Sequence, residues 1–248
     1  MSIESYLNEF TAISLEQMET VQLMDRVDTK FAFRLDKLPK LLKRLEKFYN
    51  VLEINNKKVQ TYKSLYYDTD DRVFFIEHHN QRVNRNKVRF REYVDSGLTF
   101  LEIKLKNNKG KTIKKRIKVD SISNQLSEEH QDYINKIIGK NLVLNPKQWI
   151  NFSRITFVNK MYKERLTIDT NLTFSNKIKM GGLKEIVIAE VKQDRMKKTS
   201  QFMRIAKEQY ILPIRLSKYC MSTIELDSDI KHNRFKEKVL LINKLKQS

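Results

Sequence analysis

Basic side chains occupy every second position in several stretches of the sequence, a spacing that could bind a chain of phosphates. Lys87, Arg89 and Arg91 form one such set, and an extended strand would present all three on one face. Arginine offers phosphate a planar, bidentate contact, and neighbouring cations repel one another unless an anion lies between them. The spacing therefore predicts a polyanion-binding surface. The simpler alternative is a solvated outer face above an apolar core.

Two glutamates lie within this basic pattern. Glu102 is followed two residues later by Lys104, and Glu190 is followed in the same way by Lys192. Each carboxylate would share its strand face with a lysine, where it could balance the charge of the cations. The alternative role is that of a ligand for Mg²⁺ or Mn²⁺, because these ions bridge carboxylates to phosphate oxygens. The spacing leaves both roles open.

The composition of the chain narrows the classes of partner and chemistry. The sequence has 49 Lys and Arg against 30 Asp and Glu, a net charge of +19, which indicates nucleic acid, an anionic membrane or a phosphate chain as partner. Cys220 is the single cysteine, so a disulfide framework and a thiolate metal cluster are excluded. We find no signal-peptide pattern, no apolar stretch of about 18 residues and no G-x-x-x-x-G-K-[ST] phosphate loop. We therefore expect a soluble, cytoplasmic protein.

Strands and helices must position these side chains. Apolar and polar residues alternate in eight segments joined by short loops such as Asp95–Gly97, which favours antiparallel strands. Helical spacing elsewhere, with Ser14 and Gln17 placed as a capping box, predicts flanking helices. The expected fold class is α+β, with an eight-stranded antiparallel sheet arranged as a sandwich or a closed barrel. The expected strands are residues 25–34, 61–69, 86–94, 98–106, 112–119, 152–160, 164–170 and 184–192, and the expected helices are residues 3–21, 35–49, 127–138, 199–211 and 231 onward.

The charged strand faces favour the barrel over the sandwich. If the sheet closes, its apolar face can pack outward against the helices, and the charged face then lines a lumen that needs a polyanionic ligand. His78 and His79 fall in a strand-like segment, where they would point in opposite directions, so we do not expect a shared metal site there. Residues 180–182 are typical of a turn before the last strand.

Short motifs follow one another along the chain in a fixed order. They are Asp28-Thr29-Lys30-Phe31, Leu65-Tyr66-Tyr67-Asp68-Thr69, Lys87-Val88-Arg89-Phe90-Arg91, Phe100-Leu101-Glu102-Ile103-Lys104, Lys114-Lys115-Arg116, Arg154, Tyr162-Lys163-Glu164-Arg165-Leu166, Asp169, Ala189-Glu190-Val191-Lys192 and Ser217-Lys218-Tyr219. The ordered set resembles the VTC (vacuolar transporter chaperone) polyphosphate polymerase domain of the triphosphate tunnel metalloenzyme superfamily. We therefore expect a tunnel domain at residues 24–225, an N-terminal helical segment at residues 1–23 and a basic C-terminal helix at residues 226–248.

The resemblance implies an eight-stranded tunnel in which basic residues hold a triphosphate and a glutamate helps to bind Mn²⁺ or Mg²⁺. The implied catalytic residues are Lys30, Arg89, Arg91, Lys104, Lys114, Arg154, Arg165 and Lys192. The implied substrate-binding residues are Arg26, Arg116, Tyr162, Ser217 and Lys218. The implied metal ligand is Glu190, with Glu102 as a second inward carboxylate.

By the same resemblance, the function is that of a metal-dependent polyphosphate polymerase, which transfers the γ-phosphate of ATP to a growing polyphosphate chain. A tripolyphosphatase or nucleoside triphosphatase of the same fold and a non-catalytic polyanion-binding module are the alternatives. Nucleic acid is not favoured as a partner, because the cations alternate along strands instead of lying on a basic helix or among exposed aromatic residues. The eukaryotic relatives carry an inositol-phosphate-sensing domain and membrane spans that this sequence lacks. Export of polymer would therefore require a separate membrane protein, to which the chain would bind peripherally.

Overall fold

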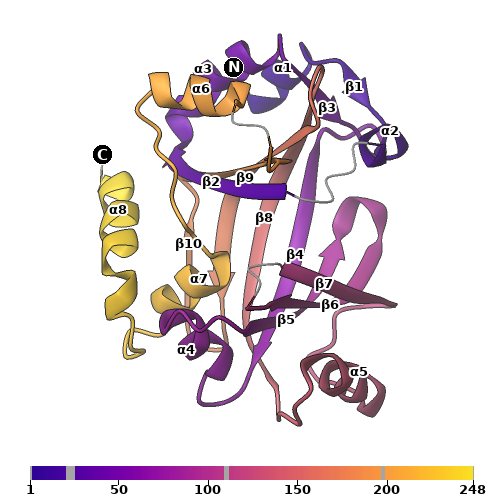
Figure 1. Ribbon diagram of the computed structural model, residues 1–248, viewed down its shortest axis with the longest axis vertical. Coiled ribbons are helices and arrows are strands. Elements are labelled where there is room, and N and C mark those ends of the chain that lie inside the picture. Colours follow the sequence, from indigo (N-terminus) through magenta and orange to yellow (C-terminus); the bar gives the residue numbers. More distant parts are fainter. Residues whose placement is uncertain (1, 21–25, 109–111, 197–198, 248) are drawn as a thin grey trace.

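The computed structural model describes residues 2–20, 26–108, 112–196 and 199–247. A curled β-sheet forms its centre and helices surround it (Figure 1). The strands are β1 (Ala12–Ile13), β2 (Arg26–Arg34), β3 (Tyr49–Leu52), β4 (Val59–Asp68), β5 (Arg85–Tyr93), β6 (Leu98–Lys106), β7 (Thr112–Val119), β8 (Asn145–Asn159), β9 (Glu164–Ser175), β10 (Met180–Leu183) and β11 (Ile186–Asp194). The α-helices are α1 (Ile3–Leu7), α2 (Leu15–Glu19), α3 (Leu38–Leu45), α4 (Val73–His79), α5 (Glu128–Ile138), α6 (Gln201–Glu208), α7 (Lys218–Leu226) and α8 (Lys236–Gln247).

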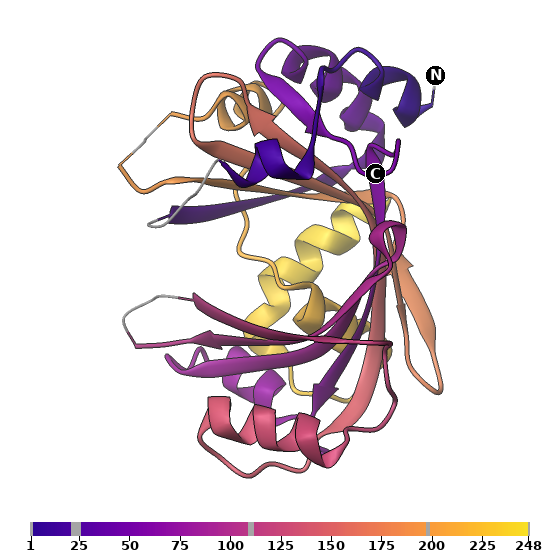
Figure 2. The ribbon, with the colours of Figure 1, turned by 90° about the vertical axis from the view of Figure 1, so that its right-hand side faces the viewer.

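Eight strands cross the sheet in the order β2, β11, β9, β8, β4, β5, β6 and β7, and each is antiparallel to its neighbours. Figure 2 shows two arms that face each other, connected by the long strands β8 and β4. We call β2, β11 and β9 the β2–β11 arm, and β5, β6 and β7 the β5–β7 arm. Among the described residues, β2 and β7 are the two edges of this path, so no row of hydrogen bonds closes the curled sheet. The predicted α+β class with an antiparallel sheet and flanking helices is confirmed.

The convex face of the sheet is apolar and covered by helices. On the β2–β11 arm, Phe31 lies in one cluster with Leu41 of α3 and Phe202 of α6. On the β5–β7 arm, Phe90 lies in another cluster with Ile134 of α5. Burial of apolar surface contributes about 25 cal/mol per Å². Since side chains alternate between the two faces of a strand, this outward packing turns the charged residues onto the concave face.

Helices α7 and α8 lie over part of the concave side of the sheet (Figure 2). Phe152 and Ile188 of the sheet form an apolar cluster there with Tyr219 of α7 and Ile242 of α8. The concave face is therefore apolar where these helices pack and charged farther along the same strands. None of the described helices is long and apolar enough to cross a membrane.

The N-terminal segment differs from its prediction. The single helix expected over residues 3–21 is two short helices, because Ala12–Ile13 pairs in parallel with β3. The capping box is confirmed at the start of α2, where Ser14 and Gln17 exchange hydrogen bonds of 2.8 and 3.2 Å. The expected helix end at residue 21, the boundary between residues 23 and 24, the strand start at residue 25 and residues 109–111 lie outside the described residues.

Two other local predictions were wrong. His78 and His79 lie on helix α4 rather than in an extended segment. The reason is the buried Asp68, which accepts the backbone N–H groups of Phe74 and Phe75 at 2.9 and 3.1 Å and so caps the first turn of α4. The turn expected at residues 180–182 is part of strand β10, which pairs with β9.

Candidate functional site

Three lysines face one another across the β5–β7 arm. Lys104 of β6 is in register with Lys87 of β5 on one side and with Lys114 of β7 on the other. Like charges directly opposite each other destabilise an antiparallel pair. Such a row is expected where an anion binds between the ammonium groups.

Glu102 is the buried carboxylate at the centre of the same arm. It accepts hydrogen bonds from Arg89 at 2.9 and 2.6 Å and from Tyr93 at 3.3 Å, and it forms an ion pair with Lys114. Burial alone would raise the pKa of Glu102, but the charges of Arg89, Arg91 and Lys114 hold it below its usual range. Both carboxylate oxygens are occupied, which favours the charge-balancing role. Its role as a second metal ligand stays a prediction.

Arg91 and Lys104 have no carboxylate partner within the described residues. Arg91 is 6% exposed, donates to Ser64 Oγ at 3.1 Å and lies over the ring of Tyr62, 5.2 Å from its centroid. Burial lowers the pKa of Arg91, and the charge of Arg89 together with burial holds the pKa of Lys104 well below its usual value. A buried charge is costly without a counter-charge. These two cations therefore mark the position where an anion is most strongly favoured.

The opposite side of the concave space has paired charges. Arg154 of β8 donates to the two oxygens of Asp169 at 2.5 and 2.8 Å, and Lys218 of α7 contacts the same carboxylate. Burial alone would raise the pKa of Asp169, but Arg154 and Lys218 lower it to about 2. Asp169 therefore stays ionised and neutralises much of the positive charge around it.

Glu190 of β11 lies between two lysines. Its Oε1 accepts a hydrogen bond from Lys30 at 2.9 Å, while Lys192 is 3.9 Å from its Oε2. Burial alone would raise the pKa of Glu190, but Lys192 and Lys30 hold it below its usual range. Thr167 is its cross-strand neighbour on β9, and the buried hydroxyl of Thr167 has no hydrogen-bond partner among the described residues. One carboxylate oxygen and one hydroxyl therefore remain available at this point.

A divalent metal ion fits Glu190 better than Glu102. One carboxylate oxygen of Glu190 is as far as 3.9 Å from Lys192, and the Glu190 side chain is 17% exposed. Glu102 is fully buried, and both of its carboxylate oxygens have partners. In the part of the chain that the structure describes, no three His, Cys, Asp or Glu side chains form a metal-binding group. Mg²⁺ and related ions often take one or two carboxylates and complete their shell with phosphate oxygens and water. The residues present therefore fit an ion that binds together with a phosphate ligand.

Helix α7 brings its N-terminal residues to the charged surface. Ser217 caps α7 and accepts a hydrogen bond from Lys87 at 2.9 Å. Tyr219 stacks on Tyr66 with ring centroids 5.2 Å apart, and the Tyr66 hydroxyl accepts a hydrogen bond from Arg89 at 2.6 Å. The predicted residues Ser217 and Lys218 are therefore part of the same charged network as the strands.

Four other predicted residues make different contacts. Arg26 pairs with Asp28 at 3.1 Å in an exposed position, and Arg116 lies 4.4 Å from the ring centroid of Phe100. Arg165 shares the face of Asp169 on β9 but donates to the carbonyl of Met18 at 3.1 Å. Tyr162 is 40% exposed in the turn between β8 and β9. Their roles stay predictions.

The structure also adds residues that were not on the predicted site list. Lys87, Asp169 and the β4 side chains Tyr62, Ser64 and Tyr66 belong to the charged network. The β4 residues occupy alternate positions of a strand that was predicted. The alternation of apolar and polar residues is hard to recognise where tyrosines occur, because a tyrosine ring is apolar and its hydroxyl is polar.

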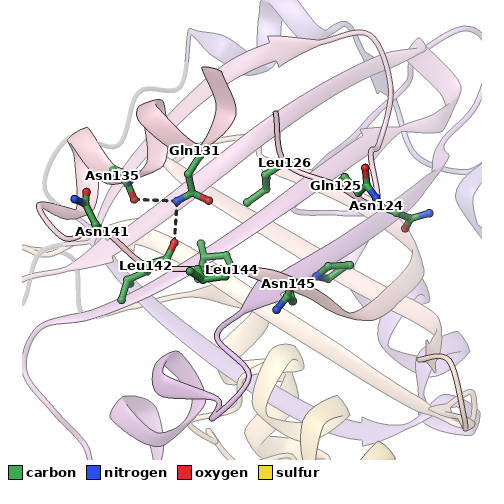
Figure 3. A pocket seen from close by; sticks show the side chains of 11 residues that line it. Asn124, Gln125, Leu126, Gln131, Asn135, Asn141, Leu142, Leu144 and Asn145 are labelled. Atoms are coloured by element: carbon green, nitrogen blue, oxygen red, sulfur yellow. Dashed lines mark hydrogen bonds between the residues drawn. The ribbon is translucent and has the colours of Figure 1, made fainter. Parts of the chain in front are cut away.

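A separate cavity of about 510 Å³ lies beside α5 (Figure 3). Amide and apolar side chains line it, including Gln131, Asn135 and Leu144, and Gln131 donates to Asn135 at 2.9 Å. The lining contains no charged side chain. This cavity is therefore chemically unlike the concave face.

Residues 25–226 match the family model described as the VTC domain. The chain belongs to the VTC domain family. VTC domains are members of the triphosphate tunnel metalloenzyme superfamily, whose enzymes bind nucleoside triphosphates and polyphosphate-like substrates and generally use divalent metal ions.

Several solved structures are similar to this chain at low sequence identity. A candidate adenylate cyclase from Bacillus halodurans has a TM-score of 0.50 and 13% identity, covering 79% of this chain and 96% of that chain. A protein from Pyrococcus horikoshii has a TM-score of 0.46 and 10% identity, covering 87% and 99%. A candidate adenylyl cyclase from Hippeastrum, described with a dominant triphosphatase activity, has a TM-score of 0.44 and 14% identity, covering 85% and 100%. No curated protein matches the sequence.

Proposed function

We propose that this VTC domain is a metal-dependent polyphosphate polymerase, which transfers the γ-phosphate of ATP to the end of a polyphosphate chain. The observation that carries the proposal is the pair of cations formed by the buried Arg91 and the half-buried Lys104, which lack a carboxylate partner among the described residues. A triphosphate would supply the missing counter-charge between Lys87, Lys104 and Lys114. The family supplies the class of substrate.

The two arms would bind different groups, phosphate oxygens on one arm and the metal ion on the other. The β5–β7 arm would hold phosphate oxygens through Arg89, Arg91 and Lys104. Glu190 on the β2–β11 arm would bind Mn²⁺ or Mg²⁺, which when bound neutralises the charge that develops on the phosphate oxygens. Lys30 would hold the Glu190 carboxylate in place, as it does at 2.9 Å in this structure.

The reaction requires no nucleophile from the protein. A terminal phosphate oxygen of the polyphosphate chain attacks the γ-phosphorus of ATP, a new P–O–P bond forms, and the bond to the β-phosphate oxygen breaks to release ADP. Charge moves onto that leaving oxygen, and fixed cations stabilise it without reorganising. Arg91 is suited to this because its contacts with Ser64 and Tyr62 already fix its position.

The test is the product formed by purified protein from ATP and Mn²⁺. We expect ADP together with a long polymer that gel electrophoresis resolves as polyphosphate. The variant Arg91→Ala should lose this product, while Lys40→Ala, an exposed substitution on α3, should not. Orthophosphate without polymer would instead establish the hydrolase alternative, in which water replaces the acceptor phosphate.

The polyanion-binding alternative has its own outcome in the same preparation. Tight binding of duplex DNA, unaffected by ATP and without nucleotide turnover, would replace the enzyme proposal by a binding module. We expect DNA binding to be weak, because the unpaired cations face the concave side of a curled sheet. The cytoplasmic location and the separate membrane partner stay predictions.

A further inference from the structure

A cavity of about 890 Å³ adjoins the charged concave face at one end. Lys30, Lys87 and Lys104 of the candidate site form part of its wall. The wall also includes residues of α4, of the loop at residues 213–217 and of the start of the C-terminal helix α8. Figure 2 shows α7 and α8 behind the space between the two arms. Any chain that leaves the site on this side enters the cavity.

Five cations outside the candidate site converge on this cavity. They are Arg85, Lys106, Arg215, Arg234 and Lys238, and Asp28 is the one carboxylate among the lining residues. Within the described residues, none of the five is paired with a carboxylate. Arg85 and Arg234 donate instead to the backbone carbonyls of Arg82 and Asn80, both at 3.3 Å. The lining therefore has positive charge without a counter-ion.

The cations are close enough to affect one another. Burial first, and then Arg85 and Arg215, lower the pKa of Lys106. Burial also lowers the pKa of Lys238, and the same two arginines contribute to that shift. An anion inside the cavity would relieve this repulsion for all four groups.

The C-terminal segment is a fixed part of the wall. The buried ring of His79 forms a 2.8 Å hydrogen bond with the side chain of Asn233, and Phe235 packs against Phe75 with ring centroids 5.9 Å apart. Arg234 lies between these two anchors in the sequence. The tail therefore presents Arg234 and Lys238 to the cavity, while Lys231 and Lys236 are exposed.

We propose that this cavity is a second phosphate-binding compartment, which holds the part of a polyphosphate chain that extends beyond the triphosphate site. The inference rests on the proposed function for the identity of the chain. Since Lys30, Lys87 and Lys104 line both spaces, one continuous chain contacts both sets of cations. The C-terminal segment thereby makes the protein prefer long chains over tripolyphosphate.

The test compares the affinity for tripolyphosphate with that for long-chain polyphosphate by isothermal titration calorimetry, with a chelator and without ATP. The double variant Arg215→Gln/Lys238→Gln should weaken long-chain binding about tenfold or more and leave tripolyphosphate binding nearly unchanged, since each contact is a charge-assisted hydrogen bond. The matched control Lys231→Gln/Lys236→Gln removes the same charge from exposed positions and should affect neither ligand. Circular dichroism verifies that both variants are folded.

Two outcomes would overturn the proposal. They are an equal loss of affinity for both ligands, or no loss of affinity for either. The measurement involves no turnover, so a protein that fails to make polymer can still support or refute the second compartment. Failure of the polymerase proposal is detected separately, in the product assay.

Discussion

The two arms of the curled sheet neutralise their cations differently. Around the β2–β11 arm, Asp169 contacts Arg154 and Lys218, and Glu190 lies between Lys30 and Lys192. On the β5–β7 arm, Glu102 is the one carboxylate in this network among the described residues, and both of its oxygens already have partners. In the first region each of these four cations contacts a carboxylate. In the second, Arg91 and Lys104 do not.

The presence or absence of a carboxylate partner distinguishes cations that stabilise the fold from cations that are available to a ligand. A buried ion pair is costly to break, because the remaining partner is left uncompensated. A buried cation without a counter-charge destabilises the ligand-free protein. Binding of an anion restores that stability. We therefore expect Arg91 and Lys104 to bind phosphate and Asp169 to stabilise the fold.

The largest expected effect comes from the saturated carboxylate. Glu102→Gln should lower the free energy of unfolding by roughly 3–5 kcal/mol, because Arg89 and Lys114 lose their buried counter-charge. Glu190→Gln should cost clearly less, since Glu190 is more exposed and Lys192 is 3.9 Å away. Urea denaturation measures both. Equal losses for the two variants would remove the distinction between a charge-balancing glutamate and a ligand glutamate.

The same pair of variants should behave in the opposite order in activity per folded molecule. Glu190→Gln should reduce metal-dependent turnover of ATP by about 100-fold or more, because the group that holds the divalent ion is lost. Electron paramagnetic resonance should show weaker Mn²⁺ binding in the same variant. Full turnover with unchanged Mn²⁺ binding would show that other residues bind the metal ion.

Removal of an unpaired cation should have two effects of opposite sign. Lys104→Met should weaken tripolyphosphate binding about tenfold, because a charge-assisted contact is lost, and should raise the melting temperature of the ligand-free protein. Lys218→Met should lower that melting temperature, because Asp169 loses a partner. Thermal unfolding with and without tripolyphosphate measures both. If Lys104→Met destabilised the ligand-free protein, the proposed repulsion in the lysine row would be refuted.

The smallest expected effect is a dependence on pH. The folded protein holds the pKa of Lys104 well below its usual value, so the folded state binds fewer protons than the unfolded state, and the free energy of unfolding rises with pH between the two pKa values. A bound polyanion restores the charge of Lys104. Binding should therefore take up protons and weaken as pH rises through the lowered pKa. Calorimetry in two buffers of different ionisation enthalpy measures the uptake, which should disappear in Lys104→Arg; an unchanged uptake in that variant would assign it elsewhere.

Much of the charged surface could be predicted because a strand has a period of two residues. That period was sufficient to group Lys87, Arg89 and Arg91 on one face before any neighbour was known. The contacts between strands could not be predicted in the same way. The pairing of Arg154 with Asp169 depends on the register between β8 and β9. The contact of Lys218 with Asp169 depends on how α7 packs against the sheet.

Short non-local contacts explain the remaining misses. A two-residue strand at Ala12–Ile13 breaks the expected N-terminal helix, because it pairs with β3 far along the chain. The cap that Asp68 provides for α4 is equally invisible in a pattern of apolar spacing. The cavity near α8 combines residues from seven separate segments. Tertiary packing, rather than local preference, decides each of these features.

The most direct test of the account is a crystal structure of the protein with tripolyphosphate. We expect phosphate oxygens within hydrogen-bond distance of Arg91 and Lys104, with the ion pairs of Arg154 and Lys218 to Asp169 intact. Phosphate bound away from Arg91 and Lys104, or bound by groups that have released Asp169, would contradict the division of the two arms.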